Sequence, residues 1–115
     1  MSTRRSQPAH KPADASAAQS LDRILESATF RQVDRLKRFL KFIVTEAIEG
    51  RGDQLKEYVI GVQVFDKEAS FDPRADPIVR VQARRLRARL ARYYRDEGVS
   101  DAIVIDLPKG GYAPL

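Results

Sequence analysis

Residues 76–97 read DPIVRVQARRLRARLARYYRDE, and we expect the rest of the chain to be organised around them. Asp76 can accept hydrogen bonds from the first free backbone N–H groups of a helix, and Pro77 suits the first helical position because it has no N–H to lose. Apolar side chains then recur at the three- and four-residue steps that place them on one helix face. They are Val79, Ala83, Leu86, Leu90, Tyr93 and Tyr94. The pattern predicts a long helix over residues 77–97 that packs a narrow apolar stripe against a core.

The remainder of this predicted helix is densely basic. Its arginines are Arg80, Arg84, Arg85, Arg87, Arg89, Arg92 and Arg95, with no acidic residue until Asp96. Like charges at this density repel one another unless an anion neutralises them. A guanidinium group can hold a phosphate or a guanine edge through two hydrogen bonds, which a lysine cannot do. The composition therefore favours a nucleic-acid partner. The alternative is a solvated face whose arginines pair with acids elsewhere in the chain.

Length and composition exclude several classes of protein. A chain of 115 residues with 43% hydrophobic content can bury one modest core, so we expect a single domain. There is no cysteine, and His10 is the only histidine, so zinc sites and Ser-His or Cys-His catalysis lack their side chains. We therefore expect no enzyme, no cofactor and no metal site.

Charge and hydropathy bear on the partner and the location. The net charge of +5 comes mainly from the first residues and from the helix after Pro77, which points to an anionic partner. No apolar run approaches the length of a membrane span, and residues 1–19 contain no apolar segment of a signal peptide. We expect a cytoplasmic, nucleoid-associated protein that has no membrane partner.

The start of the chain predicts a leader and a short helix. Residues 1–19 are rich in Ala, Ser, Pro and Gln and are expected to be disordered, so the domain would cover residues 20–115. Ser20 is expected to cap a short helix over residues 21–26.

Two longer helices are predicted before the basic one. Thr29 and Gln32 have the spacing of a capping box and would open a helix over residues 29–48. Asp53 can cap the next helix, which continues to Phe65. The β-branched run YVIGVQVF within it leaves a strand as the alternative on local preference.

The last residues change to a period of two. Apolar and polar side chains alternate over residues 103–107, as in a half-buried strand. Residues 108–111, PKGG, have the composition of a tight turn with Lys109 at its tip, and residues 112–115 would return as a partner strand. The pattern predicts a β-hairpin over residues 103–115. We therefore expect a mainly α-helical fold with a small C-terminal β-hairpin.

This order of helices, basic helix and hairpin is that of a winged helix-turn-helix domain, and sequence motifs add a resemblance. Residues 84–90, RRLRARL, and 109–112, KGGY, resemble response-regulator output domains, whose last helix carries R-R-L-R-x-K-L and whose wing ends in R-G-x-G-Y. Over residues 21–115 the chain is more similar to a bacterial domain found in front of tetratricopeptide or adenylate-cyclase-like regions. The blocks that carry this similarity are GRGDQLKEYVIGVQVF, FDPRADPIVRVQARRLRARLARYY and LPKGGY. The resemblance implies a winged helix-turn-helix fold and a DNA-binding role.

In such a fold the helix 77–97 would enter the major groove, with the hairpin 103–115 as a wing beside the minor groove. The residues expected to contact DNA are, at base edges, Arg80, Val81, Arg84 and Arg85 and, at phosphates, Arg87, Arg92 and Lys109. Val81 would touch a thymine methyl group. We therefore expect a sequence-specific double-stranded DNA-binding protein, a bacterial transcriptional regulator.

Two further partners follow from this interpretation. Small winged helices often need two copies for useful affinity, so a homodimer is expected, with Leu21, Ile24 and Leu25 as candidate contacts. The alternative function is a protein-interaction adaptor, in which the basic helix binds an acidic surface of a partner protein. A sizeable exposed apolar patch beside the helix would favour the adaptor.

Overall fold

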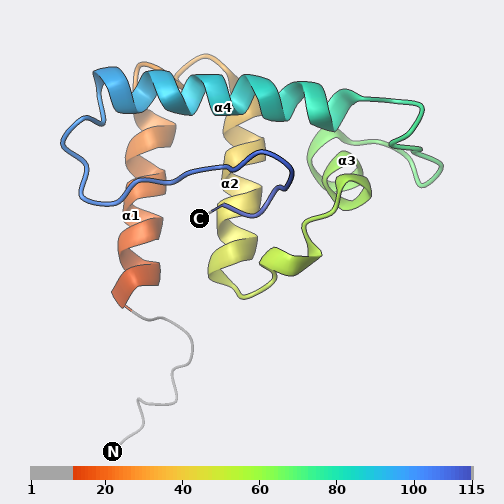
Figure 1. Ribbon diagram of the computed structural model, residues 1–115, viewed down its shortest axis with the longest axis horizontal. Coiled ribbons are helices and arrows are strands. Elements are labelled where there is room, and N and C mark those ends of the chain that lie inside the picture. Colours follow the sequence, from red (N-terminus) through yellow and green to blue (C-terminus); the bar gives the residue numbers. More distant parts are fainter. Residues whose placement is uncertain (1–11, 115) are drawn as a thin grey trace, which may run out of the picture.

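The computed structural model describes residues 12–114. Within that range the elements are four α-helices and a short 3-10 helix: α1 (Pro12–Glu26), α2 (Asp34–Ile48), η2 (Gly52–Gln54), α3 (Glu57–Phe65) and α4 (Ile78–Asp96). Figure 1 shows α1 and α2 as an antiparallel pair, with α4 lying across one end of both. The segment after α4 turns back from the α1 side, where Asp101 faces Arg23, to the η2 side, where Ala113 lies beside Gly52.

The core lies where α4 covers the α1 and α2 pair. Its fully buried apolar side chains include Ile24, Phe30, Phe39, Leu40, Ile43, Ile60, Val79 and Leu86. The predicted stripe of α4 is confirmed, since Val79, Ala83, Leu86, Leu90 and Tyr93 are all buried, while Tyr94 at its end is half-buried. Leu21 and Ile24 also lie in this core, so of the side chains expected at a homodimer contact only Leu25 is partly exposed. In residues 12–114 no helix combines the length and apolar character that crossing a membrane requires.

α4 begins and ends within one residue of the predicted bounds 77–97, and Pro77 occupies the N-cap position rather than the first helical one. The Asp76 carboxylate accepts a hydrogen bond from the Ile78 N–H at 3.1 Å and is paired with Lys67 at 2.9 Å. The hydrogen bond from Lys67 is the main reason that the pKa of Asp76 lies below its ordinary value. At the other end, a Cβ atom on Gly98 would overlap the ring of Tyr93, so only glycine fits there.

The predicted starts of the first two helices are wrong. α1 begins at Pro12 rather than after Ser20, so residues 12–19 of the expected leader are helical, while residues 1–11 lie outside the described residues. α2 begins at Asp34, and Thr29 makes no capping box. The Thr29 hydroxyl and N–H instead donate to Glu97, at 2.5 and 2.8 Å. A charged carboxylate is a stronger acceptor than the neutral amide of Gln32, so the tertiary contact prevails.

α3 is a helix, which confirms that prediction over the alternative strand, although it starts at Glu57 after the separate turn η2. A Cβ atom on Gly61 would overlap the ring of Phe71. This glycine therefore lets the loop before α4 pack directly on α3. Asp66, with φ 58°, ends the helix in the left-handed conformation.

The predicted C-terminal β-hairpin, and with it the winged helix-turn-helix fold, is wrong. The structure has no strand in any described residue, and residues 103–114 form an irregular segment. The Leu107, Pro108 and Gly111 carbonyls accept hydrogen bonds from the Arg87 guanidinium, and the Ile105 N–H donates to the Tyr94 hydroxyl. A two-stranded ribbon alone is marginal in water, whereas this segment obtains its hydrogen bonds from α4.

Part of the prediction for this segment still holds. Ile105 and Leu107 are buried and the intervening Asp106 is exposed. The predicted alternation of buried and exposed side chains is therefore correct, although the described residues form no β-sheet hydrogen bonds here. Gly110, with φ +86°, lies in the turn expected at residues 108–111. Residues 103–114 therefore lie across the helices and are held by buried apolar side chains at alternate positions; we call them the C-terminal strap. Helices are the only regular secondary structure in the described residues.

Candidate nucleic-acid interface

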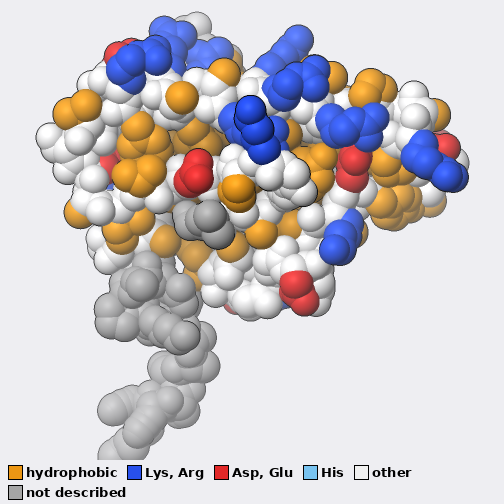
Figure 2. Space-filling model, in the orientation of Figure 1, with side chains coloured by type: hydrophobic (Ala, Val, Ile, Leu, Met, Phe, Trp, Pro, Cys, Tyr) orange, Lys and Arg blue, Asp and Glu red, His pale blue; other side chains and the backbone are white. Residues whose placement is uncertain are grey.

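The exposed side of α4 is the strongest candidate for a functional surface. Figure 2 shows lysine and arginine side chains gathered along the edge of the molecule where Figure 1 places α4. Opposite the buried stripe, the helical period brings small and basic side chains to the surface. We call this strip the outer face of α4; its exposed residues are Arg84, Arg85, Ala88, Ala91 and Arg92.

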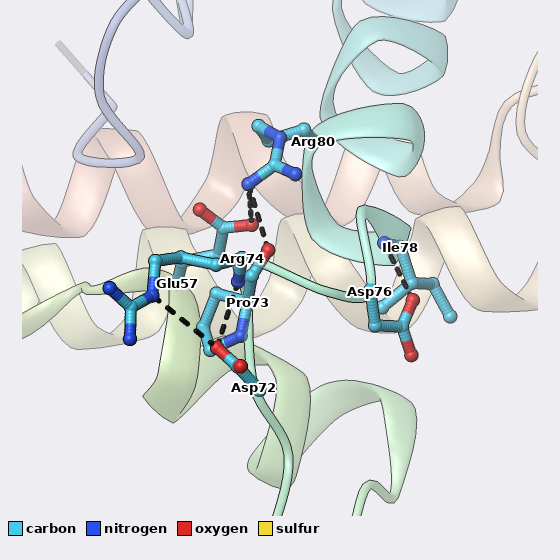
Figure 3. A network of polar contacts seen from close by, with 7 residues as sticks. All are labelled: Glu57, Asp72, Pro73, Arg74, Asp76, Ile78 and Arg80. Carbon is cyan, nitrogen blue, oxygen red and sulfur yellow. Dashed lines mark hydrogen bonds and ion pairs between the residues drawn. The ribbon is translucent and has the colours of Figure 1, made fainter.

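Two of the expected contact arginines are engaged within the chain. Arg80 Nη1 lies 2.7 Å from Glu57 Oε2 and donates to the Pro73 carbonyl at 3.1 Å, which ties α4 to α3 and to the preceding loop (Figure 3). Arg87 donates through Nε to the Leu107 carbonyl and through Nη2 to two more carbonyls of the C-terminal strap, at 3.1 to 3.3 Å. Both arginines lie on the same flank of α4, where they hold neighbouring segments in place.

The other expected arginines are placed differently. Arg84, Arg85 and Arg92 are exposed, and none of them forms an ion pair or a side-chain hydrogen bond with another described residue. Val81 is half-buried on the first turns of the helix. Lys109 is exposed in the turn of the strap and has no ion pair in residues 12–114. The structure therefore brings together the three arginines of the outer face and leaves Lys109 apart on another segment.

A groove runs beside the outer face, between α4 and the first turn of α2. It encloses about 790 Å³. It is lined by Gln32, Val33, Asp34, Arg35, Leu36, Gln82, Arg85, Ala88, Arg89 and Arg92. Four of these side chains are guanidinium groups and one, Asp34, is a carboxylate, so the groove is strongly basic. We call it the basic groove.

Sequence reasoning gave no binding role to five polar residues of this groove: Gln32, Asp34, Arg35, Gln82 and Arg89. Gln82 is only 8% exposed, although the helical pattern gave it no role. Arg89 Nη1 donates to the Thr29 carbonyl at 3.1 Å, which fixes its guanidinium next to the turn before α2. The part of the groove that α4 forms could have been predicted, because polar side chains recur at helical spacing along one side of the helix: Gln82, Arg85, Arg89 and Arg92. No pattern in the sequence indicates that α2 forms the other wall.

Three acids near α4 have partners within the chain. Glu57 is paired with Arg80, and Glu97 accepts hydrogen bonds from Thr29 and Ala28 that hold its pKa below the ordinary value. The Tyr93 hydroxyl donates to Asp101 at 2.9 Å, and burial with this hydrogen bond raises the pKa of Tyr93 to about 12. Because Glu57, Glu97 and Asp101 contact these partners, none of the three neutralises the outer face of α4.

Fold and site together define a small helical protein with one strongly basic helix surface. Comparison of the chain with protein-family models, with curated proteins and with solved structures finds no match in any of the three.

Proposed function

We propose that the protein binds double-stranded DNA in a sequence-dependent manner through the outer face of α4, and that it regulates transcription in a bacterium. The observation that carries the proposal is the exposure of Arg84, Arg85 and Arg92 without an ion-pair partner in the described part of the chain. Clustered guanidinium groups without internal neutralisation favour an anionic partner, and their planar forks match phosphates and guanine edges.

The shape of the outer face also supports a duplex partner. The major groove of B-DNA admits a single α-helix, and α4 lies at the edge of the molecule with its exposed side free of covering elements (Figure 1). Ala88 and Ala91 separate the arginines, so the backbone of α4 can approach the bases closely while the longer side chains extend around it. In this arrangement Arg84 and Arg85 read base edges and Arg92 contacts a phosphate.

The distribution of apolar surface favours DNA over the adaptor. The large exposed apolar side chains of the described residues are Tyr58, Val59, Val99 and Val104. None of them belongs to α4. Protein-binding surfaces usually have an apolar or aromatic centre, and the outer face offers arginine and alanine instead.

Selection of bound fragments from a pool of random duplexes tests the proposal. We expect enrichment of a shared motif by the wild-type protein, and loss of that motif for Arg84→Ala with Arg85→Ala. Arg74→Ala is the matched control, because it removes an equally basic side chain that is 94% exposed on the loop before α4. Failure of the wild type to retain any duplex, together with capture of an acidic protein by the same face, would support the adaptor and overturn the proposal.

A further inference from the structure

The basic groove has features that the proposed function does not use. Gln82 is more than nine-tenths buried, and its side chain has no hydrogen-bond partner among the described residues. No fully buried side-chain nitrogen or oxygen in this part of the chain lacks a partner, so the amide of Gln82 must reach the groove that it lines. The amide of Gln82 therefore opens onto the groove without a partner in the described residues, so its N–H donors and its carbonyl oxygen can bond to a ligand there.

The opposite wall supplies backbone donors. Val33 stands at the N-cap of α2 and cannot accept a hydrogen bond through its side chain, and no side chain caps the helix. The first N–H groups of a helix have no partner within it, so those of Asp34, Arg35 and Leu36 remain available beside the groove. These N–H groups and the helix dipole favour an anion.

Arginines complete the donor set. Arg92 projects from α4 without an ion pair to another described residue. The hydrogen bond from Arg89 to the Thr29 carbonyl positions its guanidinium while leaving other N–H donors unused. Asp34 is the one carboxylate in the lining, and its place in the first turn of α2 also suits the helix dipole.

We propose that the basic groove binds a phosphate group, held between the first turn of α2 and the side chains of Gln82, Arg89 and Arg92. Guanidinium forks and helix N–H groups match the several oxygens of a phosphate, and the amide of Gln82 adds a neutral donor. The groove exceeds the size of one phosphate and opens beside the outer face of α4, so it suits a phosphate that is part of a larger molecule. The assignment of this phosphate to a DNA backbone rests on the proposed function, whereas the site itself does not.

Amide NMR spectra of the full chain test the site with two probes, inorganic phosphate and a short duplex DNA. We expect each probe to shift the backbone signals of residues 34–36 and the side-chain amide of Gln82. Gln82→Glu places a carboxylate in the groove and should weaken duplex binding about ten-fold or more, the effect of losing one hydrogen bond to a charged group. Gln82→Met keeps the length of the side chain without its amide and should weaken binding in the same direction. Arg74→Ala should preserve the shifts.

The outcomes separate this inference from the proposed function. Duplex that shifts the signals of Arg84 and Arg85 but leaves residues 34–36 and Gln82 unchanged would overturn the phosphate site and retain DNA binding. Inorganic phosphate that shifts the groove signals while no duplex binds would support the site and assign it to a free phosphorylated compound. Absence of both responses would overturn both proposals.

Discussion

Two sides of the same helix use arginine for different purposes. On one flank of α4, Arg80 is paired with the Glu57 carboxylate of α3 at 2.7 Å, and Arg87 donates to three carbonyls of the strap at 3.1 to 3.3 Å. On the outer face, Arg84 and Arg85 lie between these two in sequence and have no ion-pair partner among the described residues. The high arginine content of α4 therefore has two separate explanations, one structural and one related to binding. The angular position of each residue around the helix decides whether its charge holds the fold together or faces a partner.

This division predicts that stability and DNA binding respond to different arginines. The arginines of the two sides have the same chemistry and lie on the same helix, and they differ only in the groups that contact them. Substitution of one set can therefore be compared directly with substitution of the other.

The largest expected effect is on binding, for Arg84→Ala combined with Arg85→Ala. Removing each base-reading side chain should weaken the binding free energy by about 1–3 kcal/mol and relax sequence preference. The free energy of unfolding should change by no more than about 0.5 kcal/mol, as for most surface substitutions. Fluorescence anisotropy with a selected duplex and a thermal melt measure the two quantities. A cooperative loss of folding would instead make these arginines structural.

The next effect is on stability, for Arg87→Ala. Removing the guanidinium that anchors three carbonyls of the strap should lower the free energy of unfolding by about 2 kcal/mol, as expected when hydrogen bonds to a charged group are removed. Chemical denaturation measures this decrease, with Arg84→Ala as the control of equal charge. Equal stability of the two variants would contradict the division of α4 into two sides.

A smaller effect is expected for Arg80→Ala. Its ion pair with Glu57 joins α4 to α3, but the arginine side chain is 44% exposed, so solvent screens the pair. A double-mutant cycle with Glu57→Ala should give a coupling energy of about 0.5–1 kcal/mol. Duplex affinity should fall much less than for Arg84→Ala. A comparable fall would place Arg80 in the interface after all.

The smallest effect concerns the acid at the end of α4. Hydrogen bonds from Thr29 and Ala28 lower the pKa of Glu97 below its ordinary value of 4.5, so its stabilising contribution is present above pH 4.5 and is lost as the pH falls through the folded-state pKa. Glu97→Gln should therefore melt at a lower temperature than the wild type at pH 7. The difference should shrink in more acidic solution. A difference independent of pH would show that charge has no part in this contact.

The sequence predicted the parts of the fold that depend on local period. The stripe from Val79 to Tyr93 and the alternation around Ile105 are both correct, since burial follows helical or alternating spacing even where the expected strand does not form. The hairpin was wrong because the partners of its backbone are supplied by Arg87 and Tyr94, which lie in another element.

The candidate site was predictable only in part for the same reason. An Arg-rich helix indicates an anionic partner, but the sequence does not show that Glu57 neutralises Arg80 across 23 positions. Nor does it place the first turn of α2 against Gln82, because that groove is formed by residues far apart in the chain. The local sequence pattern predicted the helix, but only the tertiary contacts show which of its arginines are paired within the chain.

The central claim, that the outer face of α4 carries charges that DNA neutralises, is tested most directly by the salt dependence of duplex binding. Anisotropy titrations should give a log–log slope of about −0.9 per phosphate neutralised. The slope should become shallower by about one unit for Arg92→Ala, which removes an expected phosphate contact, and should stay unchanged for Arg80→Ala. A flat salt response of the wild-type protein, or equal changes of slope for both variants, would contradict the account.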